Sequence, residues 1–416
     1  MLWIRLFLPF AGAYFLSYHF RTLNAVVGPV LSAELALGAA DLGLLTSAYF
    51  LAFGAAQLPL GVLLDRFGAR RINAVMLLVA AAGAAVFAHG NNITVLAVGR
   101  GMIGFGVSAC LMSSFKSFSQ WFPAESQASL TGWIMTSGTL GALAASAPLD
   151  AALHVASWRT VFLALSGVTV AVAAWVFLSV PDKAGVPRPQ PLAEQWSGIR
   201  EVLRTPHFWR FAPLSFAQIG GFMAVQSLWS SAWLMQVNGY SRTAAADHLA
   251  AMSVAMVVAY ALIGLLATRL ARRGIGPVYL LGGGMILALT TLFLIITQAV
   301  DQHYALWVAY GTFSSFGTLT YSVTSAGFPV ALSGRVNTTL NLAAFLGAFS
   351  MQWGMGLLID AQTAAGATSA IAHRNAFLAL FAVQAAACLW LVIGMRRASR
   401  ARGRAGEALE PLSAGD

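Results

Sequence analysis

Charged residues are scarce in this chain of 416 residues: lysine and arginine number 24, aspartate and glutamate number 14, and together they make up 9% of it. A soluble globular protein carries about a quarter charged residues, so this chain has too few to cover a surface that faces water. Cysteine is nearly absent, because only Cys110 and Cys388 occur, far apart and in apolar runs. These scarcities exclude an ordinary cytosolic enzyme, a disordered chain, a disulfide framework and a cysteine-based zinc site. What the chain does contain is 58% hydrophobic residues, which predicts a membrane protein.

Long apolar runs, each bounded by charges or turn residues, recur along the whole chain. A helix crosses the hydrocarbon core of a bilayer with about 20 apolar residues. The sequence lacks the alternation of apolar and polar residues that marks a membrane β-barrel, so we expect an all-α membrane protein. We predict twelve transmembrane helices, over residues 6–30, 42–63, 72–90, 93–113, 128–149, 158–180, 209–237, 246–268, 276–299, 304–330, 339–359 and 375–395.

Positive residues collect on one side of this predicted topology. With the N-terminus inside, most of the 24 lysines and arginines fall on the cytoplasmic side, and only Arg159, Arg242 and Arg374 are expected outside. Cytoplasmic loops of membrane proteins carry such an excess. We therefore predict that both termini face the cytoplasm. The formal net charge of +10 is then a topology signal and does not indicate binding to nucleic acid.

A polar, proline-rich segment divides the predicted helices into two sets of six. Prolines as dense as those at positions 181, 187, 189 and 191 cannot continue a helix. We predict an N-terminal six-helix bundle over residues 1–180, a cytoplasmic linker over 181–207 and a C-terminal six-helix bundle over 208–395. A basic tail over 396–416 is expected to be disordered and to bind anionic lipid headgroups.

The two halves repeat each other. A glycine followed five residues later by an arginine occurs at Gly61 and again at Gly264, an offset of 203 residues. The tripeptide Leu-Gly-Ala occurs at 140–142 and again at 346–348, an offset of 206 residues. Duplicated halves around a site at the membrane midplane are a transporter plan. The repeats therefore predict a six-helix unit duplicated in parallel orientation.

The segment 61–71 resembles the signature loop between helices two and three of the major facilitator superfamily. It has the glycines, the acid and the arginines of that loop in place and departs mainly at Ala69, where a basic residue is common. Gly99-Arg100-Gly101 resembles the fourth-helix motif of the superfamily, and Trp158-Arg159 opens helix six as in its members. The resemblance covers essentially the whole chain. It implies secondary active transport by a monomer in a bacterial-type inner membrane.

The resemblance also implies a role for the 61–71 loop. In the superfamily this loop is thought to hold the two halves together in the outward-open state. The residues that would form this gating latch here are Gly61, Asp65, Arg66, Gly68, Arg70 and Arg71. The alternative interpretation is plain anchoring by the arginines on the cytoplasmic side.

Ionisable residues within the membrane are the default functional candidates. All 14 acidic residues fall in predicted loops, tails or helix ends, so the deep charged groups are Arg21 on the first helix and Arg100 on the fourth. At about 1.5 Å per residue both lie on the order of 10–14 Å below the outer surface. Helices one and four line the cavity in the superfamily, so the resemblance implies that both arginines face one substrate. Two buried cations need an anion, a set of carbonyls or water as partners, and an anionic substrate would satisfy them. Arg100 has a structural or proton-coupling role as its alternative, because its motif is shared regardless of substrate.

The string from Tyr18 to Asn24 is similar to the Tyr-x-x-Arg-x-Asn pattern of organic-anion facilitators. It departs in placing Asn24 three residues after Arg21 and in having Phe20 where an acidic residue is frequent. The resemblance implies that Tyr18, Arg21 and Asn24 bind the substrate, and a guanidinium fork suits a carboxylate or a phosphate. His19 is the candidate proton carrier, because histidine titrates near neutral pH. A polar role in helix packing is its alternative.

The second half offers polar and aromatic side chains instead of charges. Gln226 and Trp229 share one face of the predicted seventh helix, while Tyr321 and Asn341 lie on the tenth and eleventh. Such groups bind polar substrates, but they also form hydrogen bonds between helices or contact lipid. We include all four as candidate substrate-binding residues.

One competing pattern suggests copper. His248, Met252 and Met256 recur every four residues on the predicted eighth helix, and Met351 and Met355 repeat the spacing on the eleventh. Soft thioethers suit Cu(I), so copper import is a minor alternative, although chance pairs are expected among 13 methionines.

We therefore predict a secondary active transporter that moves a small, carboxylate-like organic anion by alternating access, in symport with protons or in exchange for a counter-anion. Efflux of amphipathic or cationic compounds is the main alternative, disfavoured because the first helices carry no deep acidic residue. A sensor or lipid-interacting protein that kept the fold is a third. The sequence has no nucleotide-binding P-loop and no nucleophile–histidine–acid grouping, so we expect no enzyme, no cofactor and no bound metal.

Overall fold

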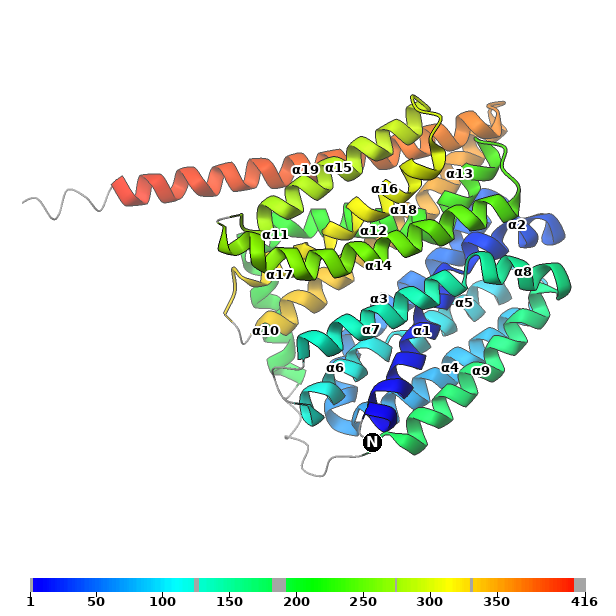
Figure 1. The fold of residues 1–416 in the computed structure, drawn as a ribbon, viewed down its shortest axis with the longest axis horizontal. Helices are drawn as coiled ribbons and strands as arrows, with labels where there is room; N and C mark the ends of the chain where they lie inside the picture. Colours follow the sequence, from blue (N-terminus) through cyan, green and yellow to red (C-terminus); the bar gives the residue numbers. More distant parts are fainter. Residues whose placement is uncertain (1–2, 123–126, 182–191, 274, 330–331, 408–416) are drawn as a thin grey trace, which may run out of the picture.

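The computed structural model describes residues 3–122, 127–181, 192–273, 275–329 and 332–407, and every regular element in these ranges is helical (Figure 1). The first half consists of η1 (Trp3–Phe7), α1 (Leu8–Thr22), α2 (Asn24–Leu35), α3 (Ala39–Phe67), α4 (Ala69–Ala88), α5 (Ile93–Val107), α6 (Cys110–Trp121), α7 (Gln127–Ala144), α8 (Ala147–Val155) and α9 (Trp158–Ser179).

The second half follows the same plan. It consists of α10 (Leu192–Arg204), α11 (Pro206–Leu214), η3 (Ser215–Ile219), α12 (Gly220–Ala224), η4 (Val225–Trp229), α13 (Ser230–Gln236), α14 (Arg242–Arg272), α15 (Pro277–Thr297), α16 (His303–Ser314), η5 (Ser315–Thr318), α17 (Leu319–Ser325), α18 (Ser333–Ala364) and α19 (Ser369–Glu407).

Eight of the described helices are long and apolar enough to cross a membrane. They correspond to eight of the twelve predicted spans. The other four predicted spans, over 6–30, 128–149, 209–237 and 304–330, are covered by consecutive shorter helices, some of them π- or 3₁₀-helical. All twelve predicted spans are thus helical over most of their described residues. The orientation of the termini stays a prediction.

Two helices differ from the predicted boundaries. The sequence predicted a last helix that ends near residue 395 and a disordered tail after it, but α19 continues to Glu407. Alanine and arginine, both strong helix formers, fill most of this extension. Within the predicted linker, α10 begins at Leu192, directly after the last of the four prolines at positions 181–191. Residues 182–191, 408–416 and the other undescribed positions are outside these observations.

Side-chain caps fix several helix starts. The Asn92 side chain accepts a hydrogen bond from the Val95 amide at 3.0 Å and begins α5. The Ser157 hydroxyl accepts one from the Thr160 amide at 3.2 Å and begins α9. Such caps satisfy amide groups that a helix start otherwise leaves unpaired.

The repeated glycines lie at corresponding points of the two halves. A Cβ at Gly141 on α7 would collide with the Phe15 carbonyl oxygen on α1, and a Cβ at Gly347 on α18 would collide with the Phe216 carbonyl oxygen on η3. Both glycines therefore permit close approach of the fifth predicted span of a half to its first. The glycine of the repeated Leu-Gly-Ala tripeptide is therefore required for helix packing in each half.

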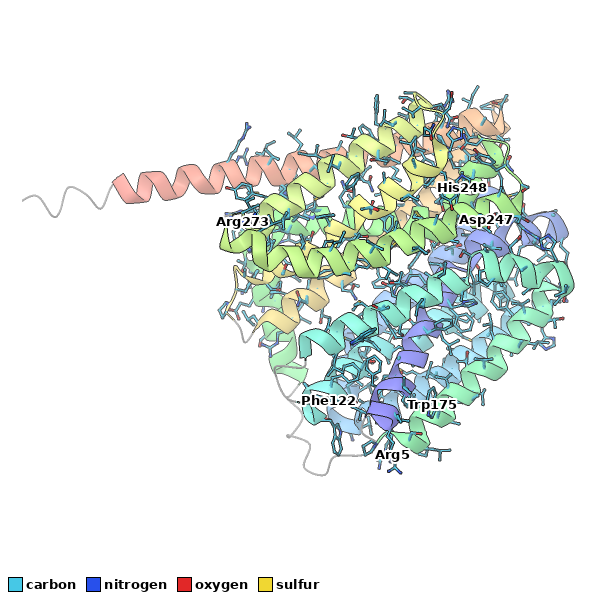
Figure 2. All side chains as sticks on the ribbon, in the orientation of Figure 1. Arg5, Phe122, Trp175, Asp247, His248 and Arg273 are labelled. Atoms are coloured by element: carbon cyan, nitrogen blue, oxygen red, sulfur yellow. The ribbon has the colours of Figure 1, made fainter. Side chains whose placement is uncertain are left out.

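The two halves meet at one end of the molecule, which we call the Asp150 end; it comprises residues 34–43, 146–159, 236–248 and 356–373. Figure 2 labels Asp247 and His248 at this end and Arg5 and Arg273 at the opposite one. The main contact between halves is made by α3 and α18. It includes Gly43, whose absent Cβ leaves room for the Gln352 carbonyl, and Phe53, which stacks on Phe345 at mid-length of both helices.

Candidate functional site

The first predicted span is interrupted at Leu23, between α1 and α2. The last carbonyls of a helix lack partners within it, and one of them is bound from another helix. Arg100 on α5 is fully buried, and its Nη1 donates to the Phe20 carbonyl oxygen at 2.9 Å. Its guanidinium also lies 5.1 Å from the centre of the Tyr49 ring. Arg100 thus holds the turn of α1 that carries Arg21.

Arg21 is 7% exposed and is covered by aromatic rings. Its guanidinium carbon lies 4.4 Å from the centre of the Tyr18 ring and 5.5 Å from those of Phe53 and of Phe345. Aromatic faces attract a cation, but they do so more weakly than an anion does. Its Nε has no hydrogen-bond partner among the described residues.

The two phenylalanines over Arg21 come from opposite halves. Phe53 on α3 and Phe345 on α18 stack with ring centres 4.2 Å apart and an interplanar angle of 17°. Sequence reasoning missed both, because a phenylalanine in an apolar run carries no signal that distinguishes the site from lipid contact or core.

Tyrosines from the second half complete the surroundings. Tyr260 on α14 and Tyr321 on α17 lie close enough to Tyr18 and Arg21 to interact with them electrostatically. The Tyr321 hydroxyl donates to Asn341 Oδ1 at 3.0 Å. The structure thus places Tyr18 against Arg21 and Tyr321 against Asn341. Tyr321, and also Tyr260, which sequence reasoning missed, interact electrostatically with the pair of Tyr18 and Arg21.

Three other candidates are engaged in helix packing. The Asn24 amide donates to Thr46 Oγ1 at 2.9 Å, the Gln226 amide lies 3.2 Å from the Met256 sulfur, and the Trp229 indole donates to the Gln352 carbonyl at 3.2 Å. Each is at most 5% exposed. These contacts correspond to the alternative interpretation, hydrogen bonds between helices.

His19 faces α7 and not the group around Arg21. Its Nδ1 lies 3.3 Å from the Gly141 carbonyl oxygen, and its ring is stacked with Phe15. Its Nε2 has no hydrogen-bond partner among the described residues.

The predicted latch lies at the end opposite the Asp150 end. Gly68, with a φ of +81°, forms the turn between α3 and α4. Arg70 Nη1 donates to the Val180 carbonyl at 3.3 Å, a contact within the first half. Three other residues of the predicted latch are exposed: Gly61, Arg66 and Arg71. The side chain of Asp65 lies outside the described residues.

The residues of the copper pattern have other contacts. His248 Nδ1 lies 2.7 Å from the Ala244 carbonyl oxygen, and Met252 packs where Gly311 lacks a side chain. Met355 lies in the apolar core of the second half. The described residues contain no group of three or more histidine, cysteine, aspartate or glutamate side chains that could hold a metal ion.

Comparison with known proteins gives three informative relatives. A probable sulfoacetate transporter, SauU, of Cupriavidus necator is 24% identical over 273 residues, 62% of this chain and 64% of the relative. A hexuronate transporter of Escherichia coli is 27% identical over 148 residues, 36% of this chain and 34% of the relative. A chloramphenicol resistance protein of Pseudomonas aeruginosa is 26% identical over 280 residues, 64% of this chain and 63% of the relative. The chain thus spans less than two thirds of each relative.

Solved structures show the same fold. A bacterial homologue of the human lysosomal transporter Spinster, in an inward-facing and unoccupied conformation, superposes with a TM-score of 0.77 at 19% identity and covers 94% of this chain and 96% of its own. The prediction that the chain is a multi-pass integral membrane protein and not an enzyme is confirmed by these similarities. The family model described as Major Facilitator Superfamily matches residues 10–352. The chain therefore belongs to the Major Facilitator Superfamily.

Proposed function

We propose that this protein moves a small organic anion across a bacterial-type inner membrane by alternating access of its two halves. The observation that carries the proposal is Arg21, a buried guanidinium enclosed by Tyr18, Phe53 and Phe345. The sulfoacetate and hexuronate named for two relatives are both small organic anions, which supports the proposal.

The charge balance around Arg21 favours an anionic ligand. All 14 acidic residues of the chain lie outside the central parts of the predicted spans. A buried cation without a charged partner is costly, and the rings around it compensate only part of that cost. A carboxylate or a sulfonate presents two oxygens to the guanidinium fork and forms charge-assisted hydrogen bonds. Symport with protons, for which His19 is the candidate carrier, and exchange for a counter-anion are both compatible with this site.

Efflux of amphipathic or cationic compounds is the second candidate function. The similarity to a chloramphenicol resistance protein favours it. The positive charge at the centre opposes it where the exported compound is a cation, because like charges in a site of low dielectric repel strongly. The contacts of the described residues around Arg21 and in the copper pattern do not favour copper import.

A thermal-shift comparison on the purified protein in detergent tests the proposal. Sulfoacetate, a hexuronate and a lipophilic cation are compared on the wild type, on Arg21→Gln and on Arg159→Gln. A ligand at 100 times its Kd adds about 2.7 kcal/mol to stability, enough to raise the melting temperature measurably. We expect an organic anion to stabilise the wild type and Arg159→Gln but not Arg21→Gln.

Arg159 is the matched control because it is an arginine of the same half that binds Glu34 and Asn91 at the Asp150 end, and its guanidinium lies over the Trp158 ring. Stabilisation by lipophilic cations alone, with no effect of Arg21→Gln, would contradict the proposal and favour efflux.

A further inference from the structure

A carboxylate of the second half binds the start of a helix in the first half. Asp360 on α18 accepts hydrogen bonds from the amides of Ala39 at 3.0 Å and Ala40 at 2.8 Å, the first two residues of α3. Gly38 permits this approach, because a Cβ there would lie 2.9 Å from Asp360 Oδ2. The amides at a helix start are unpaired and carry positive partial charge, so they bind a carboxylate favourably.

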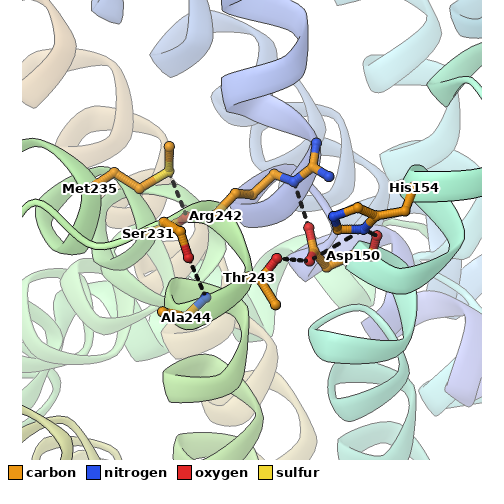
Figure 3. A network of polar contacts seen from close by, with 8 residues as sticks. Asp150, His154, Ser231, Met235, Arg242, Thr243 and Ala244 are labelled. Atoms are coloured by element: carbon orange, nitrogen blue, oxygen red, sulfur yellow. Dashed lines mark hydrogen bonds and ion pairs between the residues drawn. The ribbon is translucent and has the colours of Figure 1, made fainter.

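A carboxylate of the first half binds the start of a helix in the second half. Asp150 on α8 accepts from Arg242 Nε at 2.5 Å and from Thr243 Oγ1 at 2.7 Å, the first two residues of α14 (Figure 3). His154, on the same helix, lies 3.8 Å from the carboxylate and is more than half exposed. The Asp150 side chain itself is only 2% exposed.

The two contacts occupy corresponding places in the repeat. Ala39 and Ala40 correspond to Arg242 and Thr243 at the same offset of 203 residues that relates Gly61 to Gly264. Each pair begins the second long helix of its half, and each is bound by an aspartate from the other half. We call the two contacts the Asp150 clasp and the Asp360 clasp. They differ in chemistry, because the Asp150 clasp includes an ion pair and the Asp360 clasp uses backbone amides.

Both clasps must break when the halves separate at the Asp150 end. Asp150 and Asp360 would each lose two hydrogen bonds between halves, and hydrogen bonds to a charged group are stronger than those between neutral groups. Interactions made in only one of two conformations shift the equilibrium between them. Carboxylates that bind across the interface therefore favour closure at this end.

We propose that Asp150 and Asp360 are a matched pair of positioning residues in the transport cycle, which together set how readily the protein opens at the Asp150 end. The inference rests on the alternating-access part of the proposed function, but it does not depend on which solute is moved. Removal of either carboxylate opens this end more often, and removal of both opens it further.

The distance between spin labels across the halves tests the inference. Labels are placed at Val155→Cys on α8 and Ala365→Cys after α18, both exposed positions at the Asp150 end, in the full chain with Cys110→Ala and Cys388→Ala. Double electron–electron resonance then gives the populations of short and long distances for Asp150→Asn, Asp360→Asn and the double variant.

Asp41→Asn is the matched control. The Asp41 carboxylate accepts from the Gly38 amide at 3.2 Å, so it lies at the same helix start as the Asp360 clasp but within the first half. We expect each clasp variant to raise the ratio of long to short distances on the order of tenfold, the double variant to exceed both, and Asp41→Asn to leave the ratio unchanged. Distance distributions for Asp150→Asn and Asp360→Asn that match that of Asp41→Asn would overturn the inference.

Two additions keep the outcomes separate. Thr243→Val removes a single hydrogen-bond donor from the Asp150 clasp at nearly constant side-chain volume. If an aspartate variant does not fold, this variant tests the inference, with a smaller expected rise in the ratio of long to short distances. The anion thermal-shift experiment is run on the same variants. If the clasp variants shift the distances but no anion stabilises the protein, the inference is supported and the proposed substrate is contradicted. If an anion stabilises the protein but the clasp variants do not shift the distances, only the inference is overturned.

Discussion

Gly68 shows how one residue of the signature loop is required by the backbone. Its φ of +81° and ψ of 156° lie in a region that is essentially restricted to glycine. A Cβ at this position would meet nothing within 4 Å, so the requirement is conformational and not steric. This requirement accounts for one glycine of the motif without reference to any latch.

Gly68→Ala is therefore expected to lower the free energy of unfolding by about 1–3 kcal/mol. Gly132→Ala is the control, because Gly132 lies inside α7, is exposed and also has open space around its Cα. Alanine in a helix is more favourable than glycine by about 1 kcal/mol, so the control should keep or raise stability. Melting temperatures of the two variants in one detergent check the prediction, and equal shifts would contradict it.

At the scale of elements, Gly141 and Gly347 bring the paired helices of each half into backbone contact. The atoms that a Cβ would meet are main-chain atoms of Phe15 and Phe216, which cannot move aside as a flexible side chain can. Each added methyl group must therefore push two helices apart. The two sites are corresponding positions of the repeat, so their responses should be similar.

We expect Gly141→Ala and Gly347→Ala each to destabilise the protein by about 1–3 kcal/mol, the usual cost of overpacking. Gly283→Ala on α15 serves as the comparison, because a Cβ there meets nothing within 4 Å. The change is measured as a drop in melting temperature. A stable Gly347→Ala beside an unstable Gly141→Ala would show that the repeat does not extend to packing.

On the scale of the whole molecule, the halves share their cores. The apolar cluster of the first half includes Phe345 and Ala348 of α18, and that of the second half includes Ala25 of α2. The rings over Arg21 also come from both halves. Neither half by itself has the complete surroundings of Arg21.

Residues 1–186 and 187–416, produced together as two chains, should therefore assemble and bind the organic anion, whereas either chain alone should not. Binding is measured on the purified material by the anion-induced shift in melting temperature. If residues 1–186 alone bound the anion with the affinity of the whole protein, the second half would have no part in the site.

The sequence predicted the helical class, the twelve helical spans and the central place of Arg21, because apolar length and a buried charge are local signals. It did not predict Phe53, Phe345 or Tyr260 as neighbours of Arg21. Phe345 and Tyr260 belong to the other half, so their position depends on how the two halves meet, whereas Phe53 belongs to another helix of the same half. It also missed the contacts that Asp150 and Asp360 make across the halves, because both looked like ordinary loop or helix-end acids. Contacts between residues that are 92 to 321 positions apart leave no local pattern in a single sequence.

The enclosure of Arg21 has an electrical consequence. A monovalent anion paired with this guanidinium forms a neutral pair, so the membrane potential does no work on that pair. The empty site keeps its positive charge, and a charge that moves through the whole membrane field gains or loses about 2.3 kcal/mol per 100 mV. Voltage would then act mainly on the return of the unloaded protein, and a solute anion present on both sides would make the cycle insensitive to voltage.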